Sequence, residues 1–256
     1  MIKILGIILI LCIAFVGGDR GAISIFTLVA NLIVLGVAIW FMSIGKSILL
    51  ITLFAGIIIS CITLFYQNGT NKKTWAAFWA TMITMSIQFF FVYIMVWKSG
   101  VGGLNEIQVK GEEVLYYNLN IDISMQKVAI SVILLSTLGA VLDCALTVVS
   151  SVYEVKHHNS NMREKDLIVS GMRVGGDVMG TTVNTLLFAY AGESLLLLSY
   201  LKNQKYSLAL LINSKMLYQN CVLMIFGAIA CVIVIPISAV LITKMDAKEA
   251  ETLDKV

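Results

Sequence analysis

The chain has 256 residues, of which 59% are hydrophobic and only 13% are charged, and its mean hydropathy is +0.92. These values lie far from the usage of soluble globular domains and indicate a protein of the lipid bilayer. The net charge of +3 is spread over loops and tails without a basic block, which excludes nucleic acid as a partner.

Apolar segments follow one another along the whole chain. They cover residues 4–16, 21–45, 47–71, 74–97, 128–151, 178–201 and 216–243. All but the first reach the roughly 20 residues that cross a hydrocarbon core as a helix. The first could be read as a signal peptide, but it has no Ala-x-Ala cleavage pattern and Asp19-Arg20 leads almost directly into the next span. We therefore expect an all-α polytopic protein with about seven transmembrane helices, forming one integral membrane domain over residues 1–256.

The distribution of positive charge predicts the orientation of the spans. With the amino terminus outside, ten of the 18 Lys and Arg residues lie on the cytoplasmic side, a slight positive-inside bias. Residues 98–125 then form an extracytoplasmic loop and residues 152–170 a cytoplasmic loop. The carboxy terminus is cytoplasmic, and the expected location is the cell membrane.

The sequence offers no site for a metal, cofactor or nucleotide. The five cysteines lie in apolar runs without a Cys-x-x-Cys spacing and are expected to be buried hydrophobic residues. His157-His158 is a poor metal site on a polar loop. Gly45-Lys46-Ser47 resembles the end of a phosphate-binding loop, but Trp40 stands where that loop needs glycine. No Ser, His and acid constellation is present, so we expect no enzyme and no cofactor.

The fifth span carries a polar stripe. Asp143, Thr147, Ser150 and Glu154 are spaced four, three and four residues apart, which places them on one helix face. A charged Asp at the centre of a span costs about 2.5 to 3.5 kcal/mol, so it should face a partner or water rather than lipid. The alternative is a structural hydrogen bond between helices, worth only about 1 kcal/mol. We favour a functional Asp143.

The sixth span repeats this arrangement with Asp177, Thr181 and Asn184, spaced four and three residues apart. Because the spans are antiparallel, Asp177 and Asp143 could approach one another and together hold a proton or a cation. Asp177 also precedes an apolar run directly, so an ordinary helix N-cap is an equal alternative.

Glycines surround Asp177 at four-residue intervals. The pairs Gly171 with Gly175 and Gly176 with Gly180 would let another helix approach closely, or let this helix unwind around a substrate site. A break in the helix of this span, at the Gly-rich segment, is therefore an alternative that the sequence leaves open.

Several motifs occur together along the chain: Gly18-Asp19-Arg20-x-Ala22, Gly139-Ala140-x-x-Asp143, Ser150-Ser151-x-x-Glu154, Ser170-Gly171-Met172, Gly176-Asp177-x-Met179-Gly180-Thr181, Asn184-Thr185-Leu186, Phe188-Ala189-Tyr190, Gly192, Ser194-Leu195, Asn213, Gly227 and Pro236. With these motifs the chain resembles the YibE/F family of bacterial multi-pass membrane proteins, and in length it is similar to the smaller member of the pair. The resemblance implies a permease-like membrane protein that works with a larger paralogue.

The sequence departs from the family pattern at three positions. Leu196 stands where the family usually has proline, Lys215 where it has an acid, and Cys231 lies where it has a glycine. These departures place the role of the last span in doubt, whereas the segments around Asp143 and Asp177 fit closely.

Three functions are compatible with these residues. The first is a transport component for an unknown small solute or ion, working with a larger paralogue or as a homo-oligomer. The second is a non-transporting scaffold subunit, in which the polar and glycine residues are purely structural. The third and most remote is an intramembrane aspartyl protease, for which Val174 stands where that motif needs glycine and the Pro-Ala-Leu element is missing.

Overall fold

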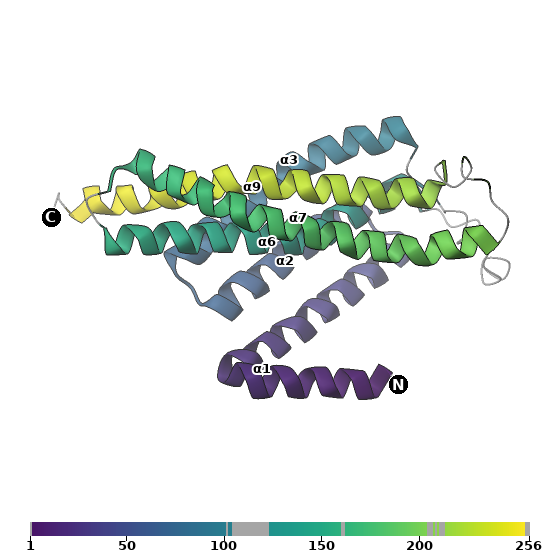
Figure 1. Ribbon diagram of the computed structural model, residues 1–256, viewed down its shortest axis with the longest axis horizontal. Helices are drawn as coiled ribbons and strands as arrows, with labels where there is room; N and C mark the ends of the chain where they lie inside the picture. The colour runs from purple at the N-terminus through teal and green to yellow at the C-terminus, as the bar shows by residue number, and fades with distance from the viewer. Residues whose placement is uncertain are drawn as a thin grey trace.

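The computed structural model describes residues 2–100, 102–103, 123–159, 162–203, 207, 209 and 213–253, and these are helical apart from short connections. The elements are α1 (Ile2–Ser43), α2 (Ile48–Cys61), the π-helical segment η1 (Ile62–Tyr66), α3 (Lys72–Ser99), α6 (Met125–His158), α7 (Glu164–Asn203) and α9 (Lys215–Leu253) (Figure 1). The expected all-α architecture is confirmed for this part of the chain.

Within the part of the chain that the structure describes, five helices are long and apolar enough to cross a membrane. They are Lys3–Ser43, Ile48–Tyr66, Lys72–Ser99, Met125–His158 and Lys215–Met245. The expected membrane character is thus supported, but the count of seven spans is not confirmed. The first two expected spans form one helical element, and α7 is not among these five helices.

A sharp bend divides α1 at Gly18. Its backbone angles are φ 53° and ψ −134°, a combination that is essentially restricted to glycine. The amino-terminal half of α1 lies below the second half and away from the other helices (Figure 1), whereas the second half contacts α2 and η1. The break that the sequence places between its first two apolar runs is therefore a bend within one helix.

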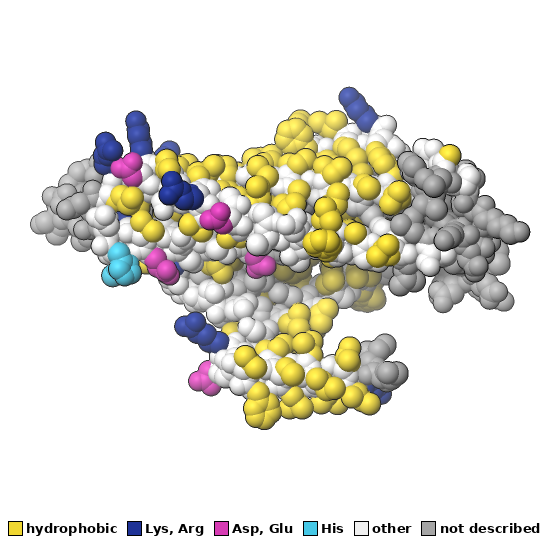
Figure 2. Space-filling model, viewed as in Figure 1, with side chains coloured by type: hydrophobic (Ala, Val, Ile, Leu, Met, Phe, Trp, Pro, Cys, Tyr) yellow, Lys and Arg dark blue, Asp and Glu magenta, His cyan; other side chains and the backbone are white. Residues whose placement is uncertain are grey.

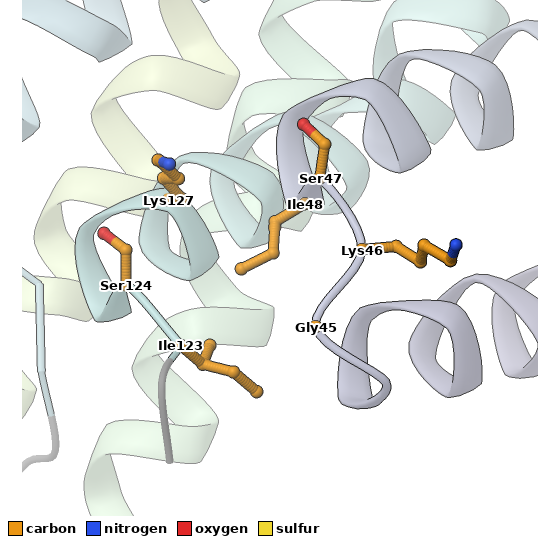
Figure 3. Close-up of a pocket in the computed structure, with 7 residues that line it drawn as sticks. All are labelled: Gly45, Lys46, Ser47, Ile48, Ile123, Ser124 and Lys127. Carbon is orange, nitrogen blue, oxygen red and sulfur yellow. The ribbon is translucent and has the colours of Figure 1, made fainter. Parts of the chain in front are cut away.

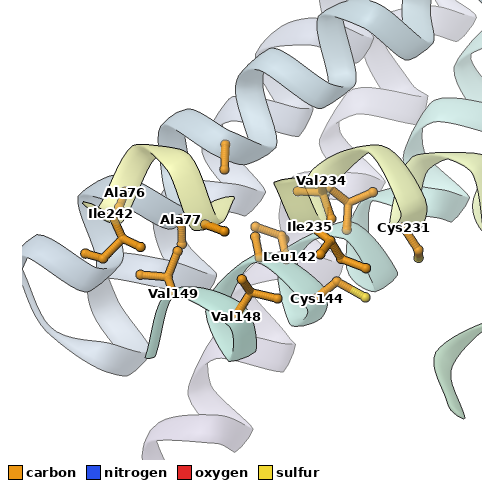
Figure 4. Close-up of a cluster of buried hydrophobic side chains, with 14 of the residues drawn as sticks. Ala76, Ala77, Leu142, Cys144, Val148, Val149, Cys231, Val234, Ile235 and Ile242 are labelled. Atoms are coloured by element: carbon orange, nitrogen blue, oxygen red, sulfur yellow. The ribbon is translucent and has the colours of Figure 1, made fainter. Parts of the chain in front are cut away.

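The core of the molecule lies between α3, α6 and α9. Small side chains of α3, Ala76 and Ala77 among them, are fully buried. They pack with Val148 of α6 and Val234 of α9 in the cluster shown in Figure 4. Small residues at such contacts let helices approach closely, which compensates for the weak hydrophobic driving force between helices in lipid.

Buried hydrogen bonds tie these helices together in pairs. Gln88 Nε2 of α3 donates to Thr137 Oγ1 of α6 at 2.9 Å, and Asn220 Nδ2 of α9 donates to Ser194 Oγ of α7 at 3.0 Å. Thr52 of α2 likewise bonds to Ser131 of α6. Each of these polar side chains thereby gains a partner on another helix, as a water-free interior requires.

The expected loops are shorter than the sequence predicts where the structure describes them. α6 continues to His158 and α7 begins at Glu164, so helix occupies most of residues 152–170. The polar ends of both helices extend past the apolar spans, and Arg163 Nε pairs with Asp166 Oδ2 at 3.0 Å. Of the expected 98–125 loop, residues 101 and 104–122 lie outside the described residues.

The cysteines divide into two groups. Cys144 and Cys231 are buried and Cys61 is half-buried, in agreement with the expectation that they are apolar packing residues. Cys12 and Cys221 are instead exposed on the outside of their helices. The expectation that all five cysteines are buried is therefore wrong for these two.

Candidate functional site

The polar stripe of α6 lies on the outside of the bundle. Asp143 and Thr147 are exposed and Ser150 is half-buried, whereas Cys144 and Val148, on the adjoining inward face of the helix, are fully buried. Thr147 Oγ1 donates to the backbone oxygen of Asp143 at 2.7 Å, within the same helix. The spacing of the sequence thus predicted one face of α6, and this face points away from the core.

The polar stripe of α7 also faces outward. Asp177, Thr181 and Asn184 are all exposed. Thr181 Oγ1 donates to the backbone oxygen of Val178 at 2.9 Å, again within its own helix. Acidic side chains follow one another along the face of the molecule that α6 and α7 present in Figure 2.

The N-cap interpretation of Asp177 is wrong. α7 begins at Glu164, so Asp177 lies well inside the helix. The reason is that Glu164 and Asp166 form a solvated first turn, with negative charge at the positive end of the helix dipole. The apolar run that made Asp177 resemble a cap begins inside an existing helix.

Two contacts fix how α6 and α7 are aligned. Cys144 Sγ lies 3.8 Å from Thr182 Oγ1. Closer to the helix ends, a Cβ on Gly171 would lie 2.5 Å from Val152 Cγ2. The antiparallel helices are therefore aligned so that the turn around residue 182 is level with residue 144, and residue 171 is level with residue 152.

This alignment sets the relative depth of the two acids. Asp143 is level with Thr181, and Asp177 is level with Thr147. With a rise of 1.5 Å per residue, the four residues from Asp177 to Thr181 correspond to an axial offset of roughly 6 Å between the two acidic residues. A dyad that shares one proton requires direct contact between its oxygens. In this alignment each acid is instead level with a threonine of the other helix.

Neither acid is neutralised by a neighbour. Among the residues that the structure describes, the carboxylates of Asp143 and Asp177 accept no side-chain hydrogen bond and form no ion pair. This differs from Gln88 and Asn220, whose polar groups are bonded to another helix inside the bundle. The alternative of a structural hydrogen bond between spans therefore has no support at Asp143.

Comparison with known proteins gives one result. A family model described as YibE/F-like protein matches residues 5–248. The chain belongs to the YibE/F-like family. The resemblance that the motifs around Asp143 and Asp177 indicate is thus confirmed over nearly the full length. No curated protein and no solved structure matches the chain.

The four glycines of this YibE/F-like protein divide between two faces of α7. Gly171 and Gly175 are buried, and a Cβ on Gly175 would lie 2.3 Å from Ile235 Cγ2 of α9. Gly176 and Gly180 are exposed, and a methyl group added at either position would have no other atom within 4 Å. α7 is continuous from Glu164 to Asn203, so the expected alternative of an unwound segment is not observed.

The stripe of α6 extends further than the sequence interpretation placed it. Ser136 and Gly139 are exposed and continue the same face toward the start of the helix. The four- and three-residue spacing that leads to Asp143 could have identified them. Across the described ranges no group of three His, Cys, Asp or Glu side chains could hold a metal ion.

Proposed function

We propose that this YibE/F-like protein is a permease-like transport component of the cell membrane, and that the outward polar faces of α6 and α7 line its pathway. The observation that carries the proposal is the pair of unneutralised carboxylates on these faces. Asp143 lies near the middle of α6, where exposure to hydrocarbon would cost about 2.5 to 3.5 kcal/mol. Water or a cation at this face removes that cost.

The side chains suit a small, partly dehydrated cation or solute. Asp143 supplies a negative charge and binds the cation or a proton. Thr147 and Thr181 supply hydroxyl oxygens, and Asn184 supplies an amide that can both donate and accept. Because the two hydroxyls bond only to backbone oxygens of their own helices, their lone pairs remain open toward a ligand.

A transport pathway needs protein on both sides, and in the single chain the polar faces of α6 and α7 are exposed. We propose that a larger YibE/F-like paralogue or a second copy of this chain supplies the second side. An intramembrane acid facing another protein is the usual arrangement for such residues. In the same proposal the carboxy terminus and the α6–α7 connection lie on the cytoplasmic side.

A non-transporting scaffold subunit is the second candidate. The close approach of Gly171 and Gly175 to neighbouring helices favours it, since these glycines serve packing. In that case a partner covers the polar faces of α6 and α7 completely and no water reaches them. The two functions therefore differ in whether water reaches the polar faces of α6 and α7.

Thiol accessibility measures this difference without knowledge of the substrate. Asp143→Cys, Thr147→Cys, Thr181→Cys and Asn184→Cys are made singly in a background in which the five native cysteines are alanine. Each is treated in membranes with an impermeant thiol reagent from either side. A transport pathway predicts reaction along both stripes.

Two matched positions control for lipid exposure and for unfolding. Val232→Cys lies on an exposed apolar face of α9, and Val148→Cys is fully buried. Both should stay protected in folded protein. Protection of all four stripe positions as well would support the scaffold function and contradict a water-filled pathway.

A further inference from the structure

Two cavities of opposite chemistry adjoin at the membrane face where α2 and α6 begin. The first has a volume of about 620 Å³ and is lined by Gly45, Lys46, Ser47, Ile48, Ile123, Ser124 and Lys127 (Figure 3). Among the described residues that line it, two are basic and none is acidic. Lys46 comes from the α1–α2 connection and Lys127 from the first turn of α6, and in Figure 3 the side chain of Lys46 extends away from Ser124 and Lys127.

The backbone adds to this positive character. Ser47 and Ser124 are the N-caps of α2 and α6, and neither side chain caps its own helix. The first-turn amides of both helices therefore keep their donors, at the positive ends of two helix dipoles. Two ammonium groups, two hydroxyls and two helix starts around one cavity form a site for a phosphate-like anion.

The second cavity continues from the first into the apolar part of the molecule. It has a volume of about 670 Å³ and lies between the second half of α1 and α6. Ile123 lines both cavities. The walls of the second cavity are mainly aliphatic, with Leu32 and Leu35 on α1 and Val132 and Leu135 on α6.

Two of the polar side chains that line this second cavity bond to α2 or η1. Asn31 Nδ2 donates to Thr63 Oγ1 at 3.0 Å, and Ser131 is bonded to Thr52. Ser43 and Ser136 bond to carbonyls of their own helices, and Asn31 Oδ1 has no partner among the described residues. Because the walls are mainly aliphatic, the cavity suits an apolar chain better than a hydrated solute. Gly139 marks its deep end, and a side chain added there would meet no atom within 4 Å.

We propose that this composite groove binds an anionic phospholipid. The phosphate lies between Lys46 and Lys127 over the starts of α2 and α6, and one acyl chain lies between α1 and α6. A soluble phosphate would use the first cavity alone and leave the second unexplained. A zwitterionic lipid would place a second positive charge beside the lysines. Basic pockets between transmembrane helices favour acidic head groups for this reason.

The test measures lipid binding to the purified full-length protein in detergent. The thermal unfolding temperature is followed while phosphatidylglycerol, phosphatidylcholine or inorganic phosphate is added, and native mass spectrometry counts the lipids retained. We expect phosphatidylglycerol to raise the unfolding temperature and to remain bound as a single lipid. Phosphatidylcholine and inorganic phosphate should do neither at the same concentration.

Variants locate the effect. Lys127→Gln should weaken phosphatidylglycerol binding roughly fivefold, on the scale of one basic residue near a membrane surface, and adding Lys46→Gln should weaken it further. Lys98→Gln is the matched control, because it removes a charge from the last turn of α3, outside the cavity. Gly139→Leu should fill the deep end and weaken binding of the long-chain lipid.

Three results would overturn the proposal. Equal binding of phosphatidylglycerol and phosphatidylcholine would show that the retained lipid is non-specific surrounding lipid. Stabilisation by inorganic phosphate alone would show a soluble anion site. Equal losses of phosphatidylglycerol binding in Lys127→Gln and Lys98→Gln would show that binding depends on the general surface charge and not on the cavity.

Discussion

Cys144 Sγ lies 3.8 Å from Thr182 Oγ1 across the contact between α6 and α7, and this pair determines where the polar faces of the two helices meet. Cys144 is fully buried, whereas Asp143, its neighbour in the chain, is exposed. Successive residues of a helix are turned by about 100°, so the thiol packs inward while the carboxylate faces out. The polar stripes consequently lie beside the packed contact between α6 and α7 and are not part of it.

Asp143→Asn is expected to abolish function while leaving insertion and the unfolding temperature unchanged. The amide keeps the size of the side chain and removes only the charge that we propose for cation or proton binding. Complementation of a strain that lacks the protein measures function. Glu154→Gln is the matched control, because this acid is 67% exposed on the same helix face and pairs with Lys73 at 3.5 Å. Normal complementation by Asp143→Asn would remove this residue from the mechanism.

Gly175→Ala is expected to destabilise the protein by about 1 to 3 kcal/mol, the usual cost of overpacking. The new methyl group would lie 2.3 Å from Ile235 Cγ2, and a β-branched side chain has few ways to move aside. Gly176→Ala provides the control, since its methyl group would meet nothing and alanine favours a helix. Denaturant unfolding in detergent measures both. Equal stabilities of the two variants would contradict the packing of α7 on α9.

Gln88→Met is expected to cost about 0.5 to 1.5 kcal/mol, the range typical of hydrogen bonds between transmembrane helices. Methionine keeps the length of the side chain but loses the bond to Thr137 at 2.9 Å. Ser86→Ala lies on the same helix and removes only a bond to the carbonyl of Met82, so it should change stability little. A comparison of their unfolding free energies tests whether α3 is tied to α6 by this pair.

Gly18→Ala is expected to disturb the bend of α1. A Cβ at φ 53° and ψ −134° costs about 1 to 3 kcal/mol, so the helix should straighten in part of the population. Spin labels at positions 7 and 33, both exposed, report this change. A straight helix would separate their Cα atoms by roughly 39 Å, and the bent native helix should show a distinctly shorter distance.

Gly17→Ala serves as the control for the bend, because Gly17 has an ordinary φ and open space around it. Its distance distribution should match that of the native protein. A Gly18→Ala distribution that also matches the native one would contradict a bend that depends on glycine.

The sequence by itself determined the features that depend on neighbouring residues. Its apolar composition identified a helical membrane protein, and the gap between the apolar segments 4–16 and 21–45 is where α1 bends, although two separate helices were expected there. The spacing of Asp143 and Thr147 predicted a common face, since helical periodicity is a local property. The motifs around Asp177 identified the family.

Only the tertiary structure decided features that depend on contacts between distant segments. The alignment of α6 with α7 offsets Asp143 from Asp177, although either helix alone is compatible with direct contact. Packing against Ile235 decides that Gly175 faces inward while Gly176 faces out. Lys46 and Lys127 are far apart in the chain and share a cavity because α2 and α6 begin at the same membrane face. No local pattern encodes such contacts, because they are chosen by the packing of whole helices.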